Sequence, residues 1–90
     1  MFENLEHLIK TIRGRKSSSS DISYTNKLLN DKKLSVSKVK EEIAELIEAV
    51  DKNSNKTHEA ADVIYHLMVY LEANDVKIED VMAELRKRQK

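Results

Sequence analysis

The feature that most constrains this chain is the scarcity of residues that interrupt helices. Its 90 residues include no proline and a single glycine, Gly14. The alternation of β-branched and polar residues that would indicate strands is absent. Charged residues instead recur three and four positions apart, the spacing of neighbours on one face of a helix. The sequence therefore predicts an all-α fold, a small helical bundle in a single domain that covers residues 1–90.

Residues 58–71 form the most apolar stretch of a chain in which 36% of the residues are charged. At helical spacing this stretch has an apolar stripe, which its neighbours widen almost to the full circumference; the stripe consists of Ala60, Ile64, Leu67 and Leu71. A helix that is apolar nearly all round is buried. We therefore expect a central helix here. Because three or four short partner helices cannot cover it, we also expect a homodimer, or a higher oligomer, that completes the bundle.

Two acidic residues open this apolar stretch. Glu59 and Asp62 are one turn apart on its remaining face, and His66 follows one turn later. Acidic side chains rarely enter a buried surface unless something positive meets them. Asp62 is the hardest to explain as ordinary surface, because aspartate is a poor helix former and stands here inside a buried run.

A second pair of acids precedes this stretch. Residues 39–50 have an apolar stripe at helical spacing, made of Val39, Ile43, Leu46, Ile47 and Val50. Glu42 lies at the edge of this stripe and Glu45 one turn further, whereas Glu41 and Glu48 point away from it. If the two helices pack face to face, the pair on each can converge four carboxylates on one point.

Such a set of oxygen ligands suits a hard divalent cation. Mg²⁺ takes oxygen ligands, keeps several waters and usually bridges to substrate phosphates. We therefore predict a metal site formed by Glu42, Glu45, Glu59 and Asp62. The alternative is that these acids are a solvated helix face and an ordinary acidic first turn. For His66 the alternatives are a role beside the substrate or the metal ligands, and a core histidine bonded to a backbone carbonyl.

Composition excludes several other classes of function. Lysine plus arginine equals aspartate plus glutamate at 16 each, so no basic excess indicates nucleic-acid binding. The longest nearly apolar run, residues 63–71, is too short to span a membrane. We expect no signal peptide in the acidic N-terminal segment. The absence of cysteine excludes disulfides and thiolate metal sites and fits a cytoplasmic protein.

Local signals divide the chain into five helices. The expected boundaries are Gly14 at the end of the first helix and Asp21 or Ser23 as the cap of a short second one. Ser35 or Ser37 is expected to cap the glutamate-rich helix. Residues 51–56 form a connector, after which Asn55 or Thr57 caps the central helix. Residues 74–75 end it, and a last amphipathic helix follows.

The acidic pattern Glu41-Glu42-x-x-Glu45, followed by Glu59-x-x-Asp62, resembles that of the all-α nucleoside triphosphate pyrophosphohydrolases of the MazG type. Within that superfamily, the chain is similar to the phosphoribosyl-ATP pyrophosphohydrolases of histidine biosynthesis from residue 23 to residue 88. The segments that carry this similarity are Ser23-Tyr24-Thr25-x-Lys27-Leu28, Lys38-Val39-x-Glu41-Glu42, residues 59–67 and Asp80-Val81-x-x-Glu84-Leu85-x-x-Arg88. Lys40 stands where this family usually has glycine.

The resemblance implies Mg²⁺-dependent hydrolysis of phosphoribosyl-ATP to phosphoribosyl-AMP and pyrophosphate, by a homodimer. It assigns catalytic positions to the acids Glu41, Glu42, Glu45, Glu59 and Asp62. It assigns substrate contacts to Lys27, Lys38, His66 and Arg88, while Arg13, Arg15 and Lys16 are weaker candidates for phosphate contact. Water would attack the α–β phosphoanhydride, and one of the glutamates would accept its proton.

Two other functions remain open at this point. A house-cleaning pyrophosphohydrolase that acts on a (d)NTP would need the same acidic pattern. A non-enzymatic helical dimerisation module would carry the acids only as surface.

Overall fold

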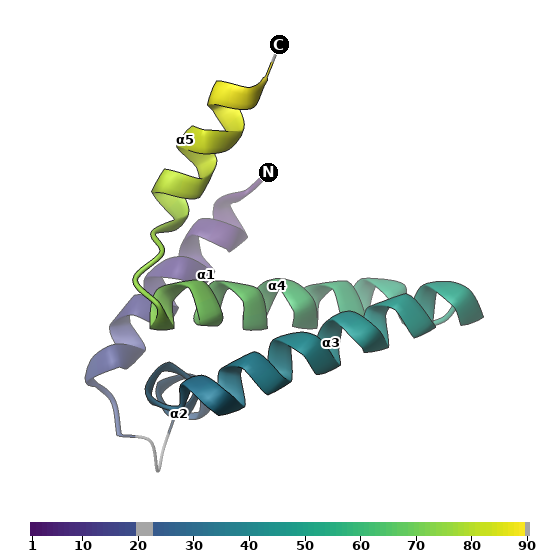
Figure 1. Ribbon diagram of the computed structural model, residues 1–90, viewed down its shortest axis with the longest axis horizontal. Coiled ribbons are helices and arrows are strands. Elements are labelled where there is room, and N and C mark those ends of the chain that lie inside the picture. Colours follow the sequence, from purple (N-terminus) through teal and green to yellow (C-terminus); the bar gives the residue numbers. More distant parts are fainter. Residues whose placement is uncertain (20–22, 90) are drawn as a thin grey trace.

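The computed structural model describes residues 1–19 and 23–89, and every regular element within them is helical. The elements in chain order are α1 (Glu3–Gly14), the short 3-10 turn η1 (Arg15–Ser17), α2 (Tyr24–Asn30), α3 (Lys32–Lys52), α4 (Lys56–Ala73) and α5 (Ile78–Arg88) (Figure 1). The prediction of an all-α fold is confirmed. None of the described helices is long and apolar enough to cross a membrane.

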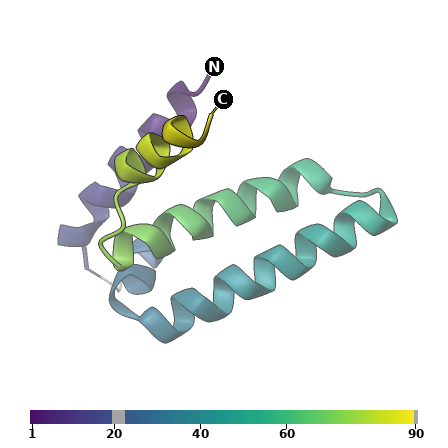
Figure 2. The same cartoon turned by 45° about the horizontal axis from the view of Figure 1, so that its top comes forward.

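The two longest helices, α3 and α4, lie side by side and antiparallel (Figure 2). Their short connection begins where α3 ends at Asn53, which has a positive φ of 53°. The N–H of Ser54 donates to the carbonyl of Ala49 at 3.0 Å, and that of Asn53 to the carbonyl of Val50 at 3.2 Å. Asparagine tolerates this left-handed conformation better than most residues, so it ends the helix at low cost.

Helix α3 begins earlier than its serines indicated. Asp31 is the N-cap, and its carboxylate accepts a hydrogen bond of 3.0 Å from the N–H of Leu34. Ser35 lies inside the helix and is buried, so the prediction that Ser35 or Ser37 caps it was wrong. For α2, Asp21 lies outside the described residues, and Ser23 is the cap: its hydroxyl accepts from the N–H of Asn26 at 3.1 Å.

The apolar core lies at the C-terminal half of α4, where α1 and α2 pack against it. Its buried members are Ile12, Leu28, Leu29 and Val69, with Leu8, Leu34, Tyr65, Met68 and Ala73 packed around them. Val69 is buried in this core, so the side of α4 that carries Val69 faces inward. This contact sets the rotation of α4 about its own axis. At 100° per residue, Ile64 and Leu67 then lie about 140–160° around the helix from Val69.

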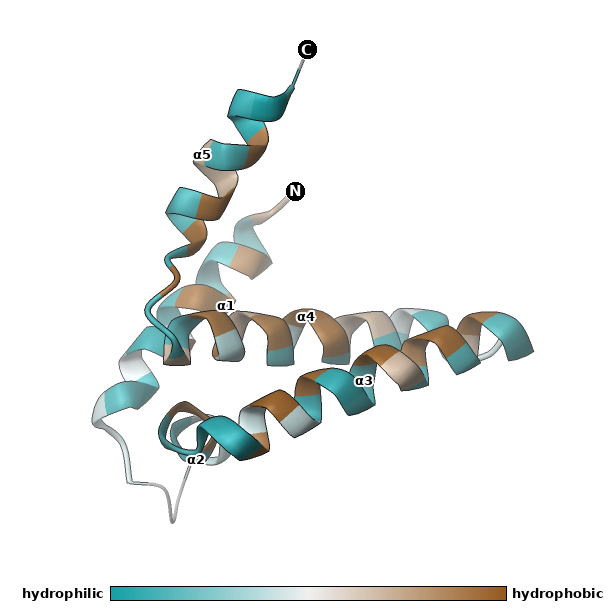
Figure 3. Cartoon of the chain, viewed as in Figure 1, coloured by the Kyte–Doolittle hydropathy of each residue, from teal (hydrophilic) through white to brown (hydrophobic). Residues whose placement is uncertain are grey.

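Two residues of the apolar stripe of α4, Ile64 and Leu67, are therefore exposed within this subunit, whereas Ala60 and Leu71 are half-buried. We call the exposed apolar side chains of α3 and α4 the apolar row; it consists of Ile43, Ile47, Val50, Ile64 and Leu67. Apolar residues alternate with polar ones along both helices (Figure 3). One subunit does not bury α4 all round, as expected of a helix with more apolar surface than its partner helices can cover, and the acidic face of α4 packs against α3. The homodimer that would cover the remainder stays a prediction.

Candidate active site

The predicted acids meet on the inner face of the α3–α4 hairpin. Glu42 and Glu45 of α3 and Glu59 of α4 can each place one carboxylate oxygen within 4.8 Å of the others. Asp62 joins Glu59 and His58 in a second group that meets the same limit. The four acids that the sequence pairs predicted therefore lie in two overlapping groups, with Glu59 common to both. We call Glu42, Glu45, Glu59 and Asp62 the carboxylate cluster.

Two oxygens of this cluster are buried without a partner. Oε2 of Glu42 and Oε2 of Glu59 have no hydrogen-bond donor among the described residues, and Glu42 is only 8% exposed. Burying a carboxylate without a donor is costly. Burial, followed by the neighbouring carboxyl of Glu45, raises the pKa of Glu42. Burial, followed by the charges of Glu45 and Asp62, likewise raises the pKa of Glu59.

This donor set fits a hard divalent cation. The four acids offer oxygen atoms from side chains three residues apart on two facing helices, and exposed His58 could add a nitrogen beside Glu59 and Asp62. The buried oxygens of Glu42 and Glu59 have no hydrogen-bond partner among the residues described. Those are the properties by which carboxylates in helical bundles bind metals. His58 stands at the rim, 74% exposed at its side chain, with Nε2 3.4 Å from the Oδ2 of Asp62.

His66 lies beside the cluster and is buried. Its Nδ1 lies 2.8 Å from the backbone carbonyl oxygen of Asp62, which can only accept, so Nδ1 carries the proton. Nε2 is then the acceptor for the hydroxyl of Tyr24, at 3.3 Å. Of the two alternatives for His66, the bond to a backbone carbonyl is confirmed, and a substrate contact stays a prediction.

The three basic residues predicted to contact the substrate lie on three different helices. Lys38 is one turn before Glu42 on α3, and its Nζ is 3.2 Å from the carboxylate of exposed Glu41, which raises the pKa of Lys38. Lys27 is exposed on α2. Arg88 pairs with Glu84 at 3.0 Å on α5, which projects away from the α3–α4 hairpin (Figure 1). One subunit therefore does not bring Arg88 to the carboxylate cluster.

The weaker basic candidates are engaged elsewhere. Nε of Arg13 is 3.2 Å from Glu72, and Nζ of Lys16 is 2.7 Å from the same carboxylate. Glu72 follows Asp62 by ten residues on α4, which is about 15 Å along the helix axis. Arg13 and Lys16 thus tie α1 and η1 to the far end of α4 and do not face the carboxylate cluster.

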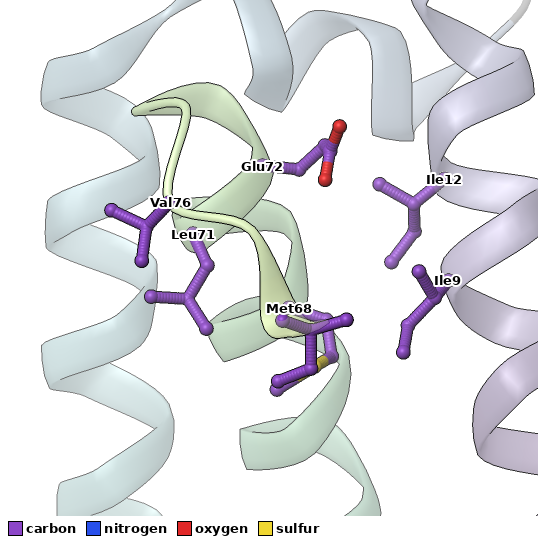
Figure 4. A pocket seen from close by; sticks show the side chains of 7 residues that line it. Ile9, Ile12, Met68, Leu71, Glu72 and Val76 are labelled. Carbon is purple, nitrogen blue, oxygen red and sulfur yellow. The ribbon is translucent and has the colours of Figure 1, made fainter. Parts of the chain in front are cut away.

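A small cavity lies at that far end and does not belong to the site. It is bounded by α1, by α4 and by the chain that leads into α5 (Figure 4), and its lining is Ile9, Ile12, Met68, Leu71, Glu72, Val76 and Ile78. Its volume of about 10 Å³ is at the lower limit for one water molecule. It is an imperfection of apolar packing and is too small for a nucleotide.

Sequence reasoning missed the contacts of α2 with α4. Beside the bond from Tyr24 to His66, the hydroxyls of Thr25 and Tyr65 form a hydrogen bond. The segment from Ser23 to Thr25 carried part of the family resemblance, but nothing in its spacing indicated which helix it would meet.

Fold and site together define an all-α protein with a carboxylate-lined site between two antiparallel helices. Residues 5–89 match the family model described as phosphoribosyl-ATP pyrophosphohydrolase. The chain belongs to this family.

Individual relatives agree with the family match. A protein of Cereibacter sphaeroides named phosphoribosyl-ATP pyrophosphatase is 42% identical over 88 residues, which cover 94% of this chain and 85% of the relative. One of the same name from Clostridium novyi is 44% identical over 92 residues, 96% of this chain and 81% of the relative. A chloroplastic histidine biosynthesis bifunctional protein of Arabidopsis thaliana is 46% identical over 69 residues, 73% of this chain and 25% of that longer protein.

Proposed function

We propose that this chain hydrolyses phosphoribosyl-ATP to phosphoribosyl-AMP and pyrophosphate, as a step of histidine biosynthesis. The names of its relatives and the family match over residues 5–89 support this activity. The observation that carries the proposal is the pair of buried, unpartnered oxygens on Glu42 and Glu59, in a cluster built only from carboxylates. Such a site holds the cation that a polyphosphate substrate needs.

The cation is Mg²⁺, and the carboxylate cluster would hold it. Its oxygen-only donor set, together with the raised pKa values of Glu42 and Glu59, supports this choice, because a cation relieves the repulsion that raises them. When bound, Mg²⁺ would neutralise charge that develops on the phosphates. A glutamate oxygen of the cluster accepts the proton of the attacking water. Lys27 and Lys38 offer positive charge to the phosphates, and exposed Glu41 orients Lys38. Because α5 projects away from the hairpin, Arg88 would contribute only across the proposed homodimer.

A cytoplasmic homodimer is part of the proposal. Ile43 and Ile47 on α3 and Ile64 on α4 are 43%, 58% and 46% exposed, and they belong to an apolar row on adjacent helices of one hairpin. Exposed large apolar side chains on two adjacent helices are surplus to the needs of one subunit and are typical of interaction surfaces. Two hairpins that pack by their apolar rows make a four-helix bundle, which buries what one subunit leaves exposed. The absence of cysteine fits a cytoplasmic location.

A (d)NTP pyrophosphohydrolase is the alternative, because the acidic pattern serves both substrates. Pyrophosphate release separates them. We expect release from phosphoribosyl-ATP with Mg²⁺, little release from a panel of dNTPs, and none in chelator. Glu42→Gln should abolish it. Glu48→Gln is the matched control, since Glu48 is exposed on the same helix and pairs with Lys52. Preferred hydrolysis of a dNTP would contradict the proposed substrate, and full activity of Glu42→Gln would contradict the proposed site.

A further inference from the structure

Tyr24 is an exposed aromatic side chain next to the carboxylate cluster. It begins α2, and 48% of the residue is exposed. Tyr65 and Tyr70 are more buried, and the exposed Phe2 precedes α1, on another part of the fold. The hydrogen bond from the N–H of Asn26 to Ser23 fixes the start of α2 and so the position from which the Tyr24 side chain leaves the backbone.

The hydroxyl of Tyr24 is directed inward although much of the residue is exposed. It donates to Nε2 of buried His66 at 3.3 Å, and the His66 ring is itself held by the 2.8 Å bond from its Nδ1 to the carbonyl of Asp62. The rings of Tyr24 and His66 meet edge to face, with centroids 6.1 Å apart and planes at 75°. A phenol held at its far end keeps one orientation without further contacts.

A second attachment joins α2 to α4. The hydroxyls of Thr25 and Tyr65 are hydrogen-bonded, and the Tyr65 ring packs edge to face on His66, with centroids 4.9 Å apart. Consecutive residues of α2, Tyr24 and Thr25, thus bind consecutive residues of α4. The Tyr24 ring is therefore a preorganised surface, which lowers the entropy that a ligand loses when it binds there.

Tyr24 stands at the end of the carboxylate cluster that faces α2. His66 links it directly to the backbone of Asp62. Partial burial raises the pKa of Tyr24, and the charges of Lys38, Glu41 and Glu42 all act on its hydroxyl. Lys38 lies one helical turn, about 6 Å, before Glu42 on α3. A nucleotide whose phosphates lie at the cluster can therefore extend its organic part over Tyr24.

We propose that the adenine base of the substrate stacks on the ring of Tyr24, with His66 as the positioning residue that holds this ring. The inference rests on the proposed function, since it assumes a nucleotide whose phosphates bind at the carboxylate cluster. Bases stack on aromatic side chains through their π-faces, and an exposed, fixed ring beside the phosphate site is the surface that such a contact requires. Lys38 would lie on the phosphate side of the same subsite.

The first test separates the base from the phosphates. Tyr24→Leu should raise KM for phosphoribosyl-ATP by about 5- to 150-fold, the loss of one stacked base, and should change kcat much less, because the contact is present in both ground and transition states. Inhibition by inorganic pyrophosphate, which has no base, should be unchanged. If pyrophosphate inhibition weakens in parallel with KM, Tyr24 supports the cluster only structurally and the proposal is wrong.

The second test does not require that the protein folds with leucine at position 24. The chain has three tyrosines and no tryptophan, so its emission reports on tyrosine alone. AMP should quench this emission in the wild type. Tyr24→Phe keeps a ring for stacking but loses the hydroxyl that His66 holds, so by calorimetry it should bind AMP more weakly than wild type and more tightly than Tyr24→Leu, while losing most of the quenching. Full quenching in Tyr24→Phe would overturn the proposal.

The two failures are distinguishable. If wild type releases no pyrophosphate from phosphoribosyl-ATP but Tyr24-dependent quenching by AMP is observed, the proposed reaction fails and the base contact stands. If pyrophosphate is released and neither variant differs from wild type, the reaction stands and the base contact is wrong.

Discussion

Glu42 and Glu59 come from opposite helices of the α3–α4 hairpin, and each keeps one carboxylate oxygen buried without a hydrogen-bond partner among the described residues. In most folds two such acids would be exposed, paired with a base or replaced. Here they converge with Glu45, so each adds to the cost of the others' charges. A bound cation would offset this cost, so the arrangement would link the stability of the hairpin to its proposed chemistry.

The first prediction concerns pH in the absence of metal. The folded state raises the pKa of Glu42 and Glu59 above the ordinary value of 4.5. The native state then binds more protons than the unfolded state between the unfolded and folded pKa values, so these groups reduce stability as pH rises through that window. Glu42→Gln removes one of them. In chelator, urea unfolding should therefore show Glu42→Gln gaining stability relative to wild type as pH increases from 4 to 7. If the difference in unfolding free energy between Glu42→Gln and wild type is the same at every pH, the proposed repulsion among the carboxylates is contradicted.

The second prediction concerns the attachment of α5. Arg13 donates to both carboxylate oxygens of Glu79, at 2.8 and 2.6 Å, and holds the pKa of Glu79 at about 2. The folded pKa lies below the unfolded one, so this contribution is present above about pH 4.5 and is lost as pH falls towards 2. At pH 7, Glu79→Gln should speed hydrogen exchange of the α5 amides, whereas Glu6→Gln, exposed on α1, should not. If the α5 amides exchange at the same rate in Glu79→Gln and Glu6→Gln, the ion pair between Arg13 and Glu79 does not hold α5 in place.

The third prediction concerns the apolar row. Wild type should have about twice the subunit mass of 10.4 kDa by light scattering at micromolar concentration. Ile47→Glu places a charge in the row and should shift the protein toward the monomer, because a buried unpaired charge is costly. Lys52→Glu introduces the same residue about 140° around α3 and should leave the mass unchanged. A monomeric wild type, or an Ile47→Glu dimer as tight as wild type, would contradict the proposed interface.

The convergence of the acids was predictable from sequence because helix geometry decides most of it. Glu42 and Glu45, like Glu59 and Asp62, are three residues apart, which places each pair on one face of its helix. A short connection makes consecutive helices antiparallel neighbours. Those two rules are local, and they were sufficient to bring four carboxylates together.

The rotation of α4 was not predictable in the same way. A helix with apolar residues on most sides has no single preferred face, so local periodicity pointed to the stripe with Ile64 and Leu67. The observed face is chosen by long-range contacts of Val69 with Ile12 and Leu28, which come from α1 and α2. The hydrogen bond from Tyr24 to His66 is a consequence of the same packing.

Thermal unfolding with and without Mg²⁺ tests the carboxylate cluster most directly. A ligand at a hundred times its dissociation constant stabilises the native state by about 2.7 kcal/mol, which raises Tm by several degrees in a domain of this size. Wild type and the control Glu48→Gln should show this rise. Asp62→Asn should melt no lower than wild type in chelator, because it relieves repulsion, and should lose most of the rise with Mg²⁺. Identical melting curves for wild type with and without Mg²⁺ would contradict the metal site.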